Sequence, residues 1–254
     1  MNKYNVARQS VLEAGSLIKK IMKEDIQVDI KSSASDFVTN VDKQIEKFLV
    51  ETINNSFPNQ NYLTEEKTRD FLGLDNLWII DPIDGTTNFV YKKRDFCISL
   101  AYYEKGMPVF GFVYDVMNDE LFEAKTGYGA FLNGEKMNLL DQKRLLSESV
   151  ISGDVYRPNF FKATPSEIKS QIIAHRFLGS GALEICHVAA NMSQAYVFNS
   201  LKAWDCAAAV IILREVGGTF LMGTQINQLV FDQQGHLFIG AANSQIMKGI
   251  KTWL

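Results

Sequence analysis

Two aspartates three positions apart give the clearest chemical signal in the sequence. Asp81 and Asp84 follow the apolar residues 78–80, whose aromatic and β-branched side chains are typical of a buried strand. Pro82 lacks a backbone N–H, so strand pairing is predicted to end there and to leave both carboxylates at the end of the strand. A pair of carboxylates in such a place favours a hard divalent cation such as Mg²⁺.

The residues that follow Asp84 favour an anion site. Gly85 permits a sharp turn, and the free N–H groups of Gly85, Thr86 and Thr87 are predicted to open a helix whose N-terminus attracts an anion. Carboxylates beside such a turn repel an anionic ligand unless a cation lies between them. The segment therefore predicts a divalent metal and a phosphate group bound together.

The composition excludes several classes of protein. The 254 residues are 46% hydrophobic and 22% charged, which excludes a disordered or collagen-like chain. The 26 basic and 29 acidic residues are intermixed, so no basic footprint for nucleic acid is visible. The 3 cysteines show no paired spacing, which favours a reducing compartment. No apolar run reaches membrane-spanning length and no secretory core follows Met1, so we expect a cytoplasmic protein without a membrane partner.

Hydrophobic periodicity predicts helices at the start of the chain. Apolar residues recur at helical spacing through the first 24 residues and again from about residue 41 to residue 53. Residues 62–64 are typical of a short strand, which leads directly into Glu65 and Glu66. These helices are expected to pack on a sheet.

The pattern of elements changes near residue 135. Between residues 96 and 136, strand-like runs alternate with turn signals, which indicates an antiparallel meander. Beyond it, short strands and helices are mixed, with helices predicted at 181–192, 206–216 and the C-terminus, and strands near 219–222 and 237–241. We therefore expect an N-terminal α+β subdomain, 1–135, with the antiparallel sheet, and a C-terminal α/β subdomain, 136–254.

Three motifs occur in a fixed order along the chain. They are Asp36-x-Val38-Thr39-x-x-Asp42, the segment from Trp78 to Phe89, and Trp204-Asp205-x-Ala207-Ala208 with Glu215-x-Gly217-Gly218. Together they resemble the inositol monophosphatase family of the lithium-sensitive, Mg²⁺-dependent phosphatase superfamily over nearly the whole length. The resemblance implies a layered αβαβα sandwich, a homodimer and the hydrolysis of a small phosphate ester.

The resemblance also implies a set of metal ligands. These are the carboxylates of Glu65, Asp81, Asp84 and Asp205 and the backbone carbonyl of Ile83. Oxygen ligands alone suit Mg²⁺ or Mn²⁺ rather than zinc, and two or three Mg²⁺ ions are expected. One ion would activate water and another would hold the phosphate and stabilise the leaving oxygen. Read without the resemblance, Asp205 is an ordinary helix cap.

Catalytic and phosphate-binding roles follow from the same resemblance. Thr86, with Asp42 and Glu65, is implied to orient the attacking water, whereas a helix-capping hydroxyl is the alternative for Thr86. The backbone N–H groups of Gly85, Thr86 and Thr87 would bind phosphate. Most of the implied metal ligands thus lie in the N-terminal subdomain, and the C-terminal one contributes Asp205 and substrate-side residues.

The resemblance also implies that the loop of Gly179, Ser180 and Gly181 binds the substrate, together with Asp84 and Asp205. A helix that starts with a Ser cap would show the same pattern in this loop. In inositol-specific members an acidic residue lies seven positions before the aspartate that matches Asp205, and here that position is Phe198. A phenyl ring cannot accept the inositol hydrogen bond, so Phe198 either packs against a flat group such as a base or belongs to the core.

The sequence prediction is Mg²⁺-dependent hydrolysis of an inositol-1-phosphate type of ester by a metal-activated water. An NADP 2′-phosphatase, a 3′-phosphoadenosine 5′-phosphate nucleotidase and a fructose-1,6-bisphosphatase are alternatives within the same chemistry. A non-catalytic regulator associated with RNA or transcription is the alternative of another class. The intact carboxylate set and the lack of a basic stripe count against that alternative and against a nucleic-acid partner.

Overall fold

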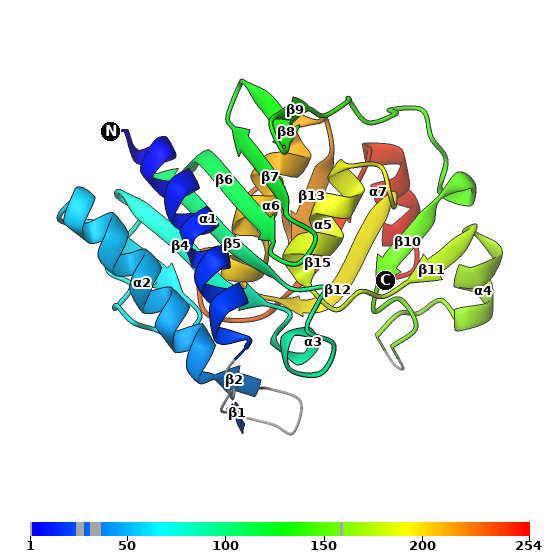
Figure 1. The fold of residues 1–254 in the computed structure, drawn as a ribbon. Helices are drawn as coiled ribbons and strands as arrows, with labels where there is room; N and C mark the ends of the chain where they lie inside the picture. The colour runs from blue at the N-terminus through cyan, green and yellow to red at the C-terminus, as the bar shows by residue number, and fades with distance from the viewer. Residues whose placement is uncertain (1, 24–27, 31–36, 158–159) are drawn as a thin grey trace.

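Helices and sheets alternate in five layers (Figure 1). The computed structural model describes residues 2–23, 28–30, 37–157 and 160–254, and of residues 28–30 and 37–39 it describes the backbone alone. Asp36 of the first motif lies outside the described residues. The αβαβα sandwich that the sequence implies is confirmed, with helices outside both sheets and between them.

Two long helices form the outer layer on one side of the molecule. Helix α1 (Lys3–Ile21) and helix α2 (Asn40–Ser56) pack against each other and against the first sheet. Their buried residues recur at helical spacing, as predicted, and α2 buries Asp42 and Glu46 beside its apolar residues. A small antiparallel ribbon, β1 (Val28–Ile30) and β2 (Phe37–Thr39), precedes α2.

The first sheet contains seven strands in chain order, and only its first pair is parallel. The strands are β3 (Asn61–Thr64), β4 (Leu77–Asp84), β5 (Cys97–Glu104), β6 (Met107–Asp115), β7 (Glu120–Lys125), β8 (Gly129–Leu132) and β9 (Glu135–Lys136). The predicted meander is therefore confirmed. The short helix α3 (Thr86–Tyr91) follows β4.

Strand β4 corrects one expectation. The prediction that pairing ends at Pro82 was wrong, because β4 continues to Asp84. Asp81 pairs with Ser99 and Asp84 pairs with Cys97, with a register irregularity between them. Between these two pairs β4 advances by three residues while β5 advances by two, so β4 forms a β-bulge. Pro82, which has no backbone N–H to donate, lies within this bulge. The sheet tolerates the proline at the one place where the ladder is interrupted.

The second sheet has six strands in the order β11-β10-β12-β15-β13-β14. Their bounds are β10 (Val150–Gly153), β11 (Ala174–Arg176), β12 (Ala195–Leu201), β13 (Thr219–Met222), β14 (Gln225–Ile226) and β15 (His236–Ala241). The sequence analysis missed β14, a two-residue exposed edge strand without a hydrophobic pattern. The outer face carries α4 (Pro165–Ser170), α7 (Ser244–Lys251) and the 3₁₀ turn η1 (Leu146–Glu148).

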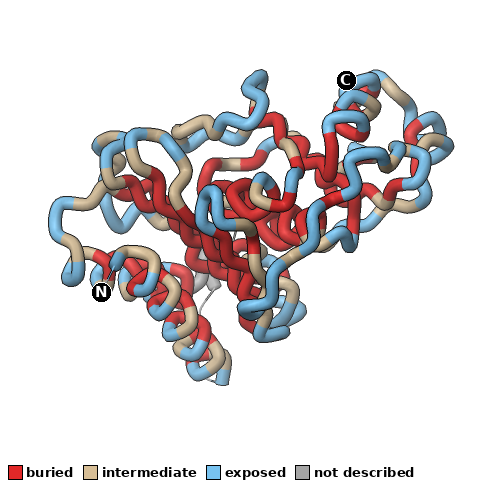
Figure 2. The backbone as a smooth tube through the Cα atoms, turned by 90° about the horizontal axis from the view of Figure 1, so that it is seen from above, coloured by how far each residue is buried: buried red, intermediate tan, exposed pale blue. Residues whose placement is uncertain are grey.

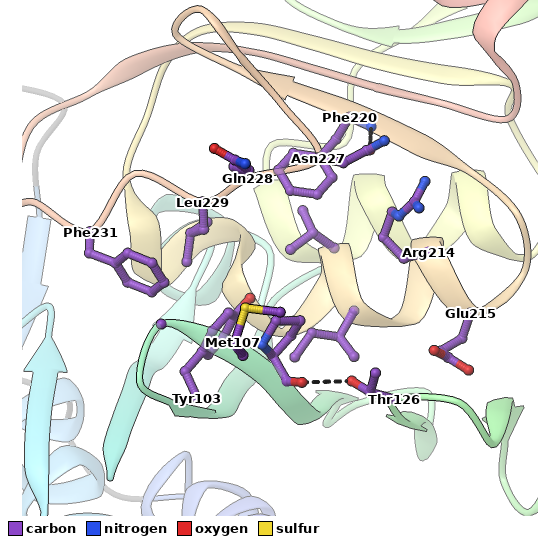
Figure 3. Close-up of a pocket in the computed structure, with 14 residues that line it drawn as sticks. Tyr103, Met107, Thr126, Arg214, Glu215, Phe220, Asn227, Gln228, Leu229 and Phe231 are labelled. Carbon is purple, nitrogen blue, oxygen red and sulfur yellow. Dashed lines mark hydrogen bonds between the residues drawn. The ribbon is translucent and has the colours of Figure 1, made fainter. Parts of the chain in front are cut away.

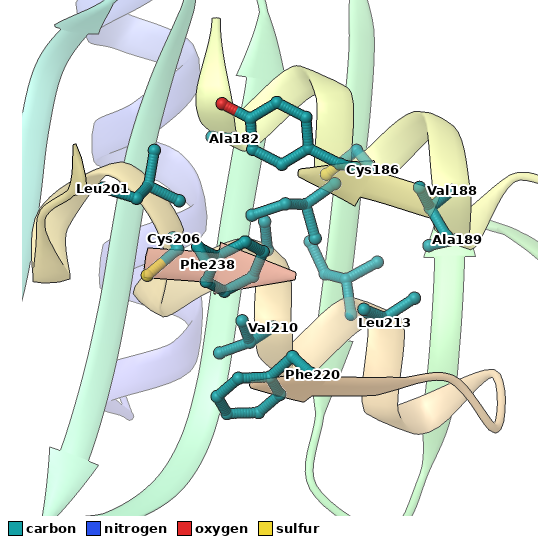
Figure 4. Close-up of a cluster of buried hydrophobic side chains, with 14 of the residues drawn as sticks. Ala182, Cys186, Val188, Ala189, Leu201, Cys206, Val210, Leu213, Phe220 and Phe238 are labelled. Atoms are coloured by element: carbon teal, nitrogen blue, oxygen red, sulfur yellow. The ribbon is translucent and has the colours of Figure 1, made fainter. Parts of the chain in front are cut away.

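Two helices fill the layer between the sheets. Helix α5 (Gly181–Ala189) packs on β12, and helix α6 (Ala203–Glu215) packs on β4 to β8 and on β13. Figure 4 shows their side chains meeting Phe220 and Phe238 of the second sheet. A Cβ on Gly111 of β6 would lie 2.7 Å from the carbonyl oxygen of Ala208, so glycine there lets α6 lie directly on the sheet. This close packing fixes α6 in the centre of the molecule.

The core is continuous across this middle layer. One hydrophobic cluster includes residues of both sheets with α5 and α6, and a second lies between the first sheet and the helices α1 and α2 (Figure 2). The sheets occupy separate parts of the chain, but a subdomain boundary near residue 135 stays a prediction because the shared cluster crosses it. No helix among the described residues combines the length and apolar character needed to cross a membrane.

Candidate active site

Four acidic side chains from distant parts of the chain line one cavity of about 670 Å³. They are Glu65 after β3, Asp81 and Asp84 on β4, and Asp205 in the first turn of α6. All of the carboxylates that the sequence implies as metal ligands are therefore brought together. The bulge in β4 and the central position of α6 explain how residues more than 100 positions apart meet here.

The Asp84 carboxylate joins β4 to the start of α5. Its Oδ2 accepts hydrogen bonds from the Ser180 hydroxyl at 2.6 Å and the Ala182 N–H at 2.7 Å, and its Oδ1 accepts one from the Gly181 N–H at 3.2 Å. The thiol of Cys97 lies 3.7 Å from Oδ2. Asp84 is thus held by the N-terminus of α5, an arrangement that fixes its orientation within the cavity.

The position of Asp205 is compatible with both alternatives that the sequence left open, a helix cap and a metal ligand. Its Oδ2 accepts the backbone N–H of Lys202 at 2.8 Å, so it stabilises the first turn of α6 as a helix-capping acid does. The same side chain lines the cavity with the other three acids. Capping and ligand binding are compatible here, because a carboxylate has two oxygens and several lone pairs.

Burial sets the electrostatics of the cavity. Desolvation, and next the negative charge of Glu65, hold the pKa of Asp81 well above its usual range. Desolvation, followed by the charge of Asp84, does the same to the pKa of Asp205. Desolvation raises the pKa of Asp84 to about 6, although the bonds from Ser180 and from the start of α5 oppose the rise. Such clustered buried acids favour a bound cation, which would stabilise all their charged forms.

The donor set fits a divalent ion that keeps part of its own shell. Among the described residues, no three His, Cys, Asp or Glu side chains form a compact group that could enclose an ion by themselves. The four acids line the cavity together with other residues, and Asp84 directs both oxygens toward the start of α5. Mg²⁺ characteristically binds through one or two carboxylates, with water and substrate phosphate as its other ligands. The residues therefore suit Mg²⁺ bound together with a phosphate ester.

Thr86 lies between two of the implied partners. Its hydroxyl is 3.1 Å from the carbonyl oxygen of Ile83 and 3.3 Å from Oδ1 of Asp42, which is buried in the first turn of α2. One hydroxyl proton serves both acceptors in turn, and the oxygen keeps lone pairs for a further hydrogen bond. The structure thus brings Thr86 and Asp42 together, while their catalytic role stays a prediction.

The turn after β4 has the shape that the anion prediction needs. Gly85 adopts φ 92° and precedes α3, which begins at Thr86. A side chain at Gly85 would be strained at this φ and would also lie 3.2 Å from the Asp95 carbonyl oxygen. Gly85 and Thr87 both line the cavity. Phosphate binding by the N–H groups of residues 85–87 stays a prediction.

The predicted substrate residues lie beside the acids in the same cavity. Gly179 and Gly181 line it, and the Ser180 hydroxyl both donates to Asp84 and accepts the Leu183 N–H at 3.5 Å as the cap of α5. The Ser-cap alternative is therefore correct as local geometry, and it also orients an acid of the site. Their contact with a substrate stays a prediction.

Phe198 on β12 lines the same cavity. Its ring lies parallel to that of Tyr196, with an interplanar angle of 12° and a centroid distance of 6.1 Å. Phe198 is half-buried and also packs against the core. Its surroundings therefore fit both alternatives from the sequence, a core residue and a ring that could face a flat group in the cavity. Phe177, which is 58% exposed, adds a second ring to the cavity wall.

Sequence reasoning missed Glu46, which holds the loop that carries Glu65. Glu46 is fully buried on α2, and its Oε1 accepts hydrogen bonds from the Thr64 hydroxyl at 2.8 Å and from the N–H and hydroxyl of Thr68 at 2.8 and 2.5 Å. Its Oε2 accepts the Glu66 N–H at 2.7 Å. The available signal was its place four residues after Asp42, on a buried stripe of an otherwise amphipathic helix.

Asn88 was also missed, although it belongs to the second motif. Its amide donates to the Asp95 carbonyl oxygen at 2.8 Å and to the Leu178 carbonyl oxygen at 2.9 Å. It therefore ties α3 and its following loop to the segment that leads into Gly179. Glu66, by contrast, contributes its backbone N–H to Glu46.

Comparison with known proteins places these features in a family. The model of the inositol monophosphatase family matches residues 2–250. An inositol-1-monophosphatase of Bacillus subtilis is 37% identical over 221 residues, which cover 85% of this chain and 83% of the relative. The Nus factor SuhB of Pasteurella multocida is 35% identical, over 84% of this chain and 82% of the relative.

Solved structures share both the fold and the sequence pattern. SaIMPase-II of Staphylococcus aureus, bound to inositol monophosphate, has a TM-score of 0.83 and 33% identity, covering 100% of this chain and 94% of its own. An IMPase/NADP phosphatase complexed with Mg²⁺ and phosphate has a TM-score of 0.83 and 30% identity, covering 94% and 89%. The resemblance first seen in three motifs is thereby confirmed, and this chain belongs to the inositol monophosphatase family.

Proposed function

We propose that this protein is a Mg²⁺-dependent phosphomonoesterase that hydrolyses small phosphate esters of the inositol-1-phosphate type. Its family is one of phosphoric monoester hydrolases, so the reaction class follows from membership. The observation that carries the proposal is the convergence of four acids, Asp81 and Asp84 buried and Glu65 and Asp205 partly buried, on one cavity beside the turn at Gly85. Acids with raised pKa values are stabilised in their charged forms by a cation, and a cation bound there attracts an anion such as phosphate.

The protein's own groups divide into those that would hold the ions and those that would hold the phosphate ester and water. Glu65, Asp81, Asp84, Asp205 and the carbonyl of Ile83 would hold the ions. Bound Mg²⁺ supplies a Lewis acid that neutralises phosphate charge and lowers the pKa of water. The Thr86 hydroxyl, which lies within hydrogen-bond distance of Asp42, would orient the attacking water together with Asp42 and Glu65. The N–H groups of residues 85–87 hold the phosphate oxygens, while residues 179–181 and Asp84 contact the leaving alcohol.

A nucleotide ester is the second candidate substrate. Phe177 and Phe198 offer rings on the cavity wall, and the nearby Lys202 and Lys92 offer positive charge. A flat base and an additional phosphate suit such a wall better than an inositol ring does. Solved relatives carry 2′AMP and NADP, which supports an NADP 2′-phosphatase more than the 3′-phosphoadenosine or fructose-bisphosphate alternatives.

A regulatory role is a candidate of another class, because one relative is named a Nus factor. The net charge of −3 and the intermixed charges give no electrostatic support for nucleic-acid binding. A purely regulatory protein would also have no use for four acids gathered in one cavity. We therefore favour the enzyme.

The finer properties extend the proposal. We expect two or three Mg²⁺ ions, replacement by Mn²⁺, and inhibition by lithium. A homodimer is supported by the exposed apolar residues Ile173, Phe177 and Met192, of which the last two border one shallow hollow. The free, buried cysteines suit the reducing cytoplasm.

Phosphate release across a substrate panel tests the proposal. The panel contains inositol-1-phosphate, NADP, 3′-phosphoadenosine 5′-phosphate and fructose-1,6-bisphosphate, each with Mg²⁺, with a chelator, or with Mg²⁺ and lithium. Mg²⁺-dependent turnover that is fastest with inositol-1-phosphate supports the first candidate, and fastest turnover of NADP supports the second. No phosphate release from any substrate in Mg²⁺ or Mn²⁺, from folded protein, refutes the enzymatic proposal.

A further inference from the structure

A second cavity of about 540 Å³ lies beside the C-terminal half of α6 (Figure 3) and shares no lining residue with the acidic cavity. Its walls come from the β5–β6 hairpin, from the last two turns of α6, and from β13 with the segment 227–231 that follows β14. The volume is in the range of small-molecule sites, which are concave, mostly apolar and furnished with a few polar groups. No part of the proposed phosphatase reaction uses it.

The walls of this second cavity are aromatic. Tyr103, Phe220 and Phe231 line it, and the rings of Tyr103 and Phe231 meet edge to face with centroids 5.4 Å apart. The Tyr103 hydroxyl donates to the Ala207 carbonyl oxygen at 3.0 Å, so the ring rather than the hydroxyl is offered to an occupant. Val210 and Ile211 of α6 complete an apolar floor suited to a flat hydrocarbon body.

Arg214 supplies the positive charge of the cavity. One of its N–H groups donates to the Gly218 carbonyl oxygen at 2.8 Å, and it forms no ion pair within residues 2–23, 37–157 and 160–254. A guanidinium has five N–H donors in a planar fork, which matches the two oxygens of a carboxylate. The Gly218 carbonyl oxygen therefore occupies only part of the hydrogen-bonding capacity of the Arg214 guanidinium.

Glu215 limits the charge of the occupant. Its two oxygens accept the N–H groups of Gly127 and Gly129 at 2.8 and 2.7 Å, which keeps a negative charge at the edge of the same cavity. Arg214 and Glu215 together give the lining no net charge, so the second negative charge of a phosphate dianion would be repelled more than the single charge of a carboxylate. The chemistry thus selects a monoanion rather than a phosphate ester.

We propose that this cavity binds a small aromatic carboxylate, with its ring between Tyr103, Phe220 and Phe231 and its carboxylate on Arg214. This site shares no lining residue with the acidic cavity, and its proposed ligand is not a phosphate ester. It borders the same helix that carries Asp205, so an occupant would contact α6 about one and a half to three turns after Asp205.

Calorimetric titration of the full-length protein with 1-naphthylacetate tests the proposal. The solution contains Mg²⁺ and excess inorganic phosphate, which competes for the acidic cavity. The neutral 2-(1-naphthyl)ethanol serves as the matched ligand without a carboxylate. We expect the carboxylate to bind about tenfold or more tightly than the alcohol, the change expected of one charge-assisted hydrogen bond.

Two variants locate the binding. Arg214→Met should remove the preference for the carboxylate while the alcohol still binds, and Arg144→Met, outside the cavity, should leave the preference unchanged. Met107→Trp should fill the cavity and abolish binding of both ligands. Met107 is 67% exposed, so the fold tolerates a larger side chain there, and Met117→Trp at a 41% exposed position outside the cavity is its control.

Three results would overturn the proposal. The first is that neither naphthalene ligand binds the unmodified protein at millimolar concentration. The second is an unchanged carboxylate preference in folded Arg214→Met protein. The third is unchanged binding in Met107→Trp protein, which would place the ligand elsewhere.

Discussion

Replacement of Glu46 by Gln is the sharpest test of how the active-site loop is held. Glu46 accepts four hydrogen bonds from residues 64–68, and three of them meet Oε1. A Gln amide keeps one acceptor oxygen, so its NH₂ group would face the Glu66 N–H at the other position. One charge-assisted bond, worth about 1.5–3 kcal/mol, is lost, and the three others weaken because their acceptor becomes neutral.

The loss of this bond is partly offset, since a buried charge is removed with it. We therefore expect the free energy of unfolding to fall by about 2 kcal/mol and the Tm by roughly 4–8 °C for a chain of this length. The loop between β3 and β4 should shift, and Glu65 lies within it. We expect kcat to fall about tenfold or more, with a higher Mg²⁺ concentration for half-maximal rate, measured by phosphate release.

Controls separate positioning from stability. Glu51→Gln changes an exposed acid on the same helix, which faces Lys47 at 3.9 Å, and should alter neither Tm nor kcat appreciably. If Glu46 acts through Glu65, the double variant with Glu65→Gln should be no slower than Glu65→Gln alone. A folded Glu46→Gln protein with unchanged kcat and unchanged Mg²⁺ dependence, or losses that add in the double variant, would refute the reasoning.

Three further predictions concern the acidic cavity. Asp84→Asn should lower Mg²⁺-dependent turnover by more than about 100-fold while circular dichroism shows a retained fold, and near-normal turnover would contradict its role as a ligand. Thr86→Val should lower kcat by about 10²–10⁴-fold while Thr86→Ser preserves most of it, and equal rates for both would contradict the hydroxyl's role. Because the pKa of Asp84 is raised to about 6 in the metal-free protein, the folded state binds a proton that the unfolded state lacks between about pH 4 and pH 6. As pH rises through this window, the Tm of the metal-free protein should therefore fall relative to the Tm of the Asp84→Asn variant. Added Mg²⁺ should reverse this Tm difference above pH 6. A Tm difference that does not change with pH would exclude a contribution of Asp84 protonation to stability.

Local patterns predicted the elements well where one physical rule dominated. The apolar periodicity of α1 and α2, and the turn signals of the meander, depend on neighbouring residues alone. Pro82 shows the limit of such rules, because its missing N–H is harmless inside a bulge that only pairing with β5 creates. The β14 edge strand has no pattern at all and exists because β13 lies beside it.

The sequence predicts the motif residues of the site, but it does not predict the residues that hold them in position. Asp81, Asp84 and Asp205 stand out by type and spacing, but the loop held by Glu46 follows from contacts between α2 and a segment about 20 residues later. The second cavity is harder still. Its lining comes from residues 103 to 231, and no local pattern in any of these segments indicates that they enclose a space.

The two helices of the middle layer explain why the acidic cavity depends on a ligand ion. The start of α5 donates N–H groups to Asp84, and the start of α6 donates one to Asp205, so each acid receives the positive end of a helix. These bonds favour the charged carboxylates, yet burial and mutual repulsion still raise both pKa values. The protein therefore compensates only part of the negative charge that it gathers. The remainder is available to a divalent cation, and its neutralisation links metal binding to both the stability of the middle layer and the attraction of phosphate.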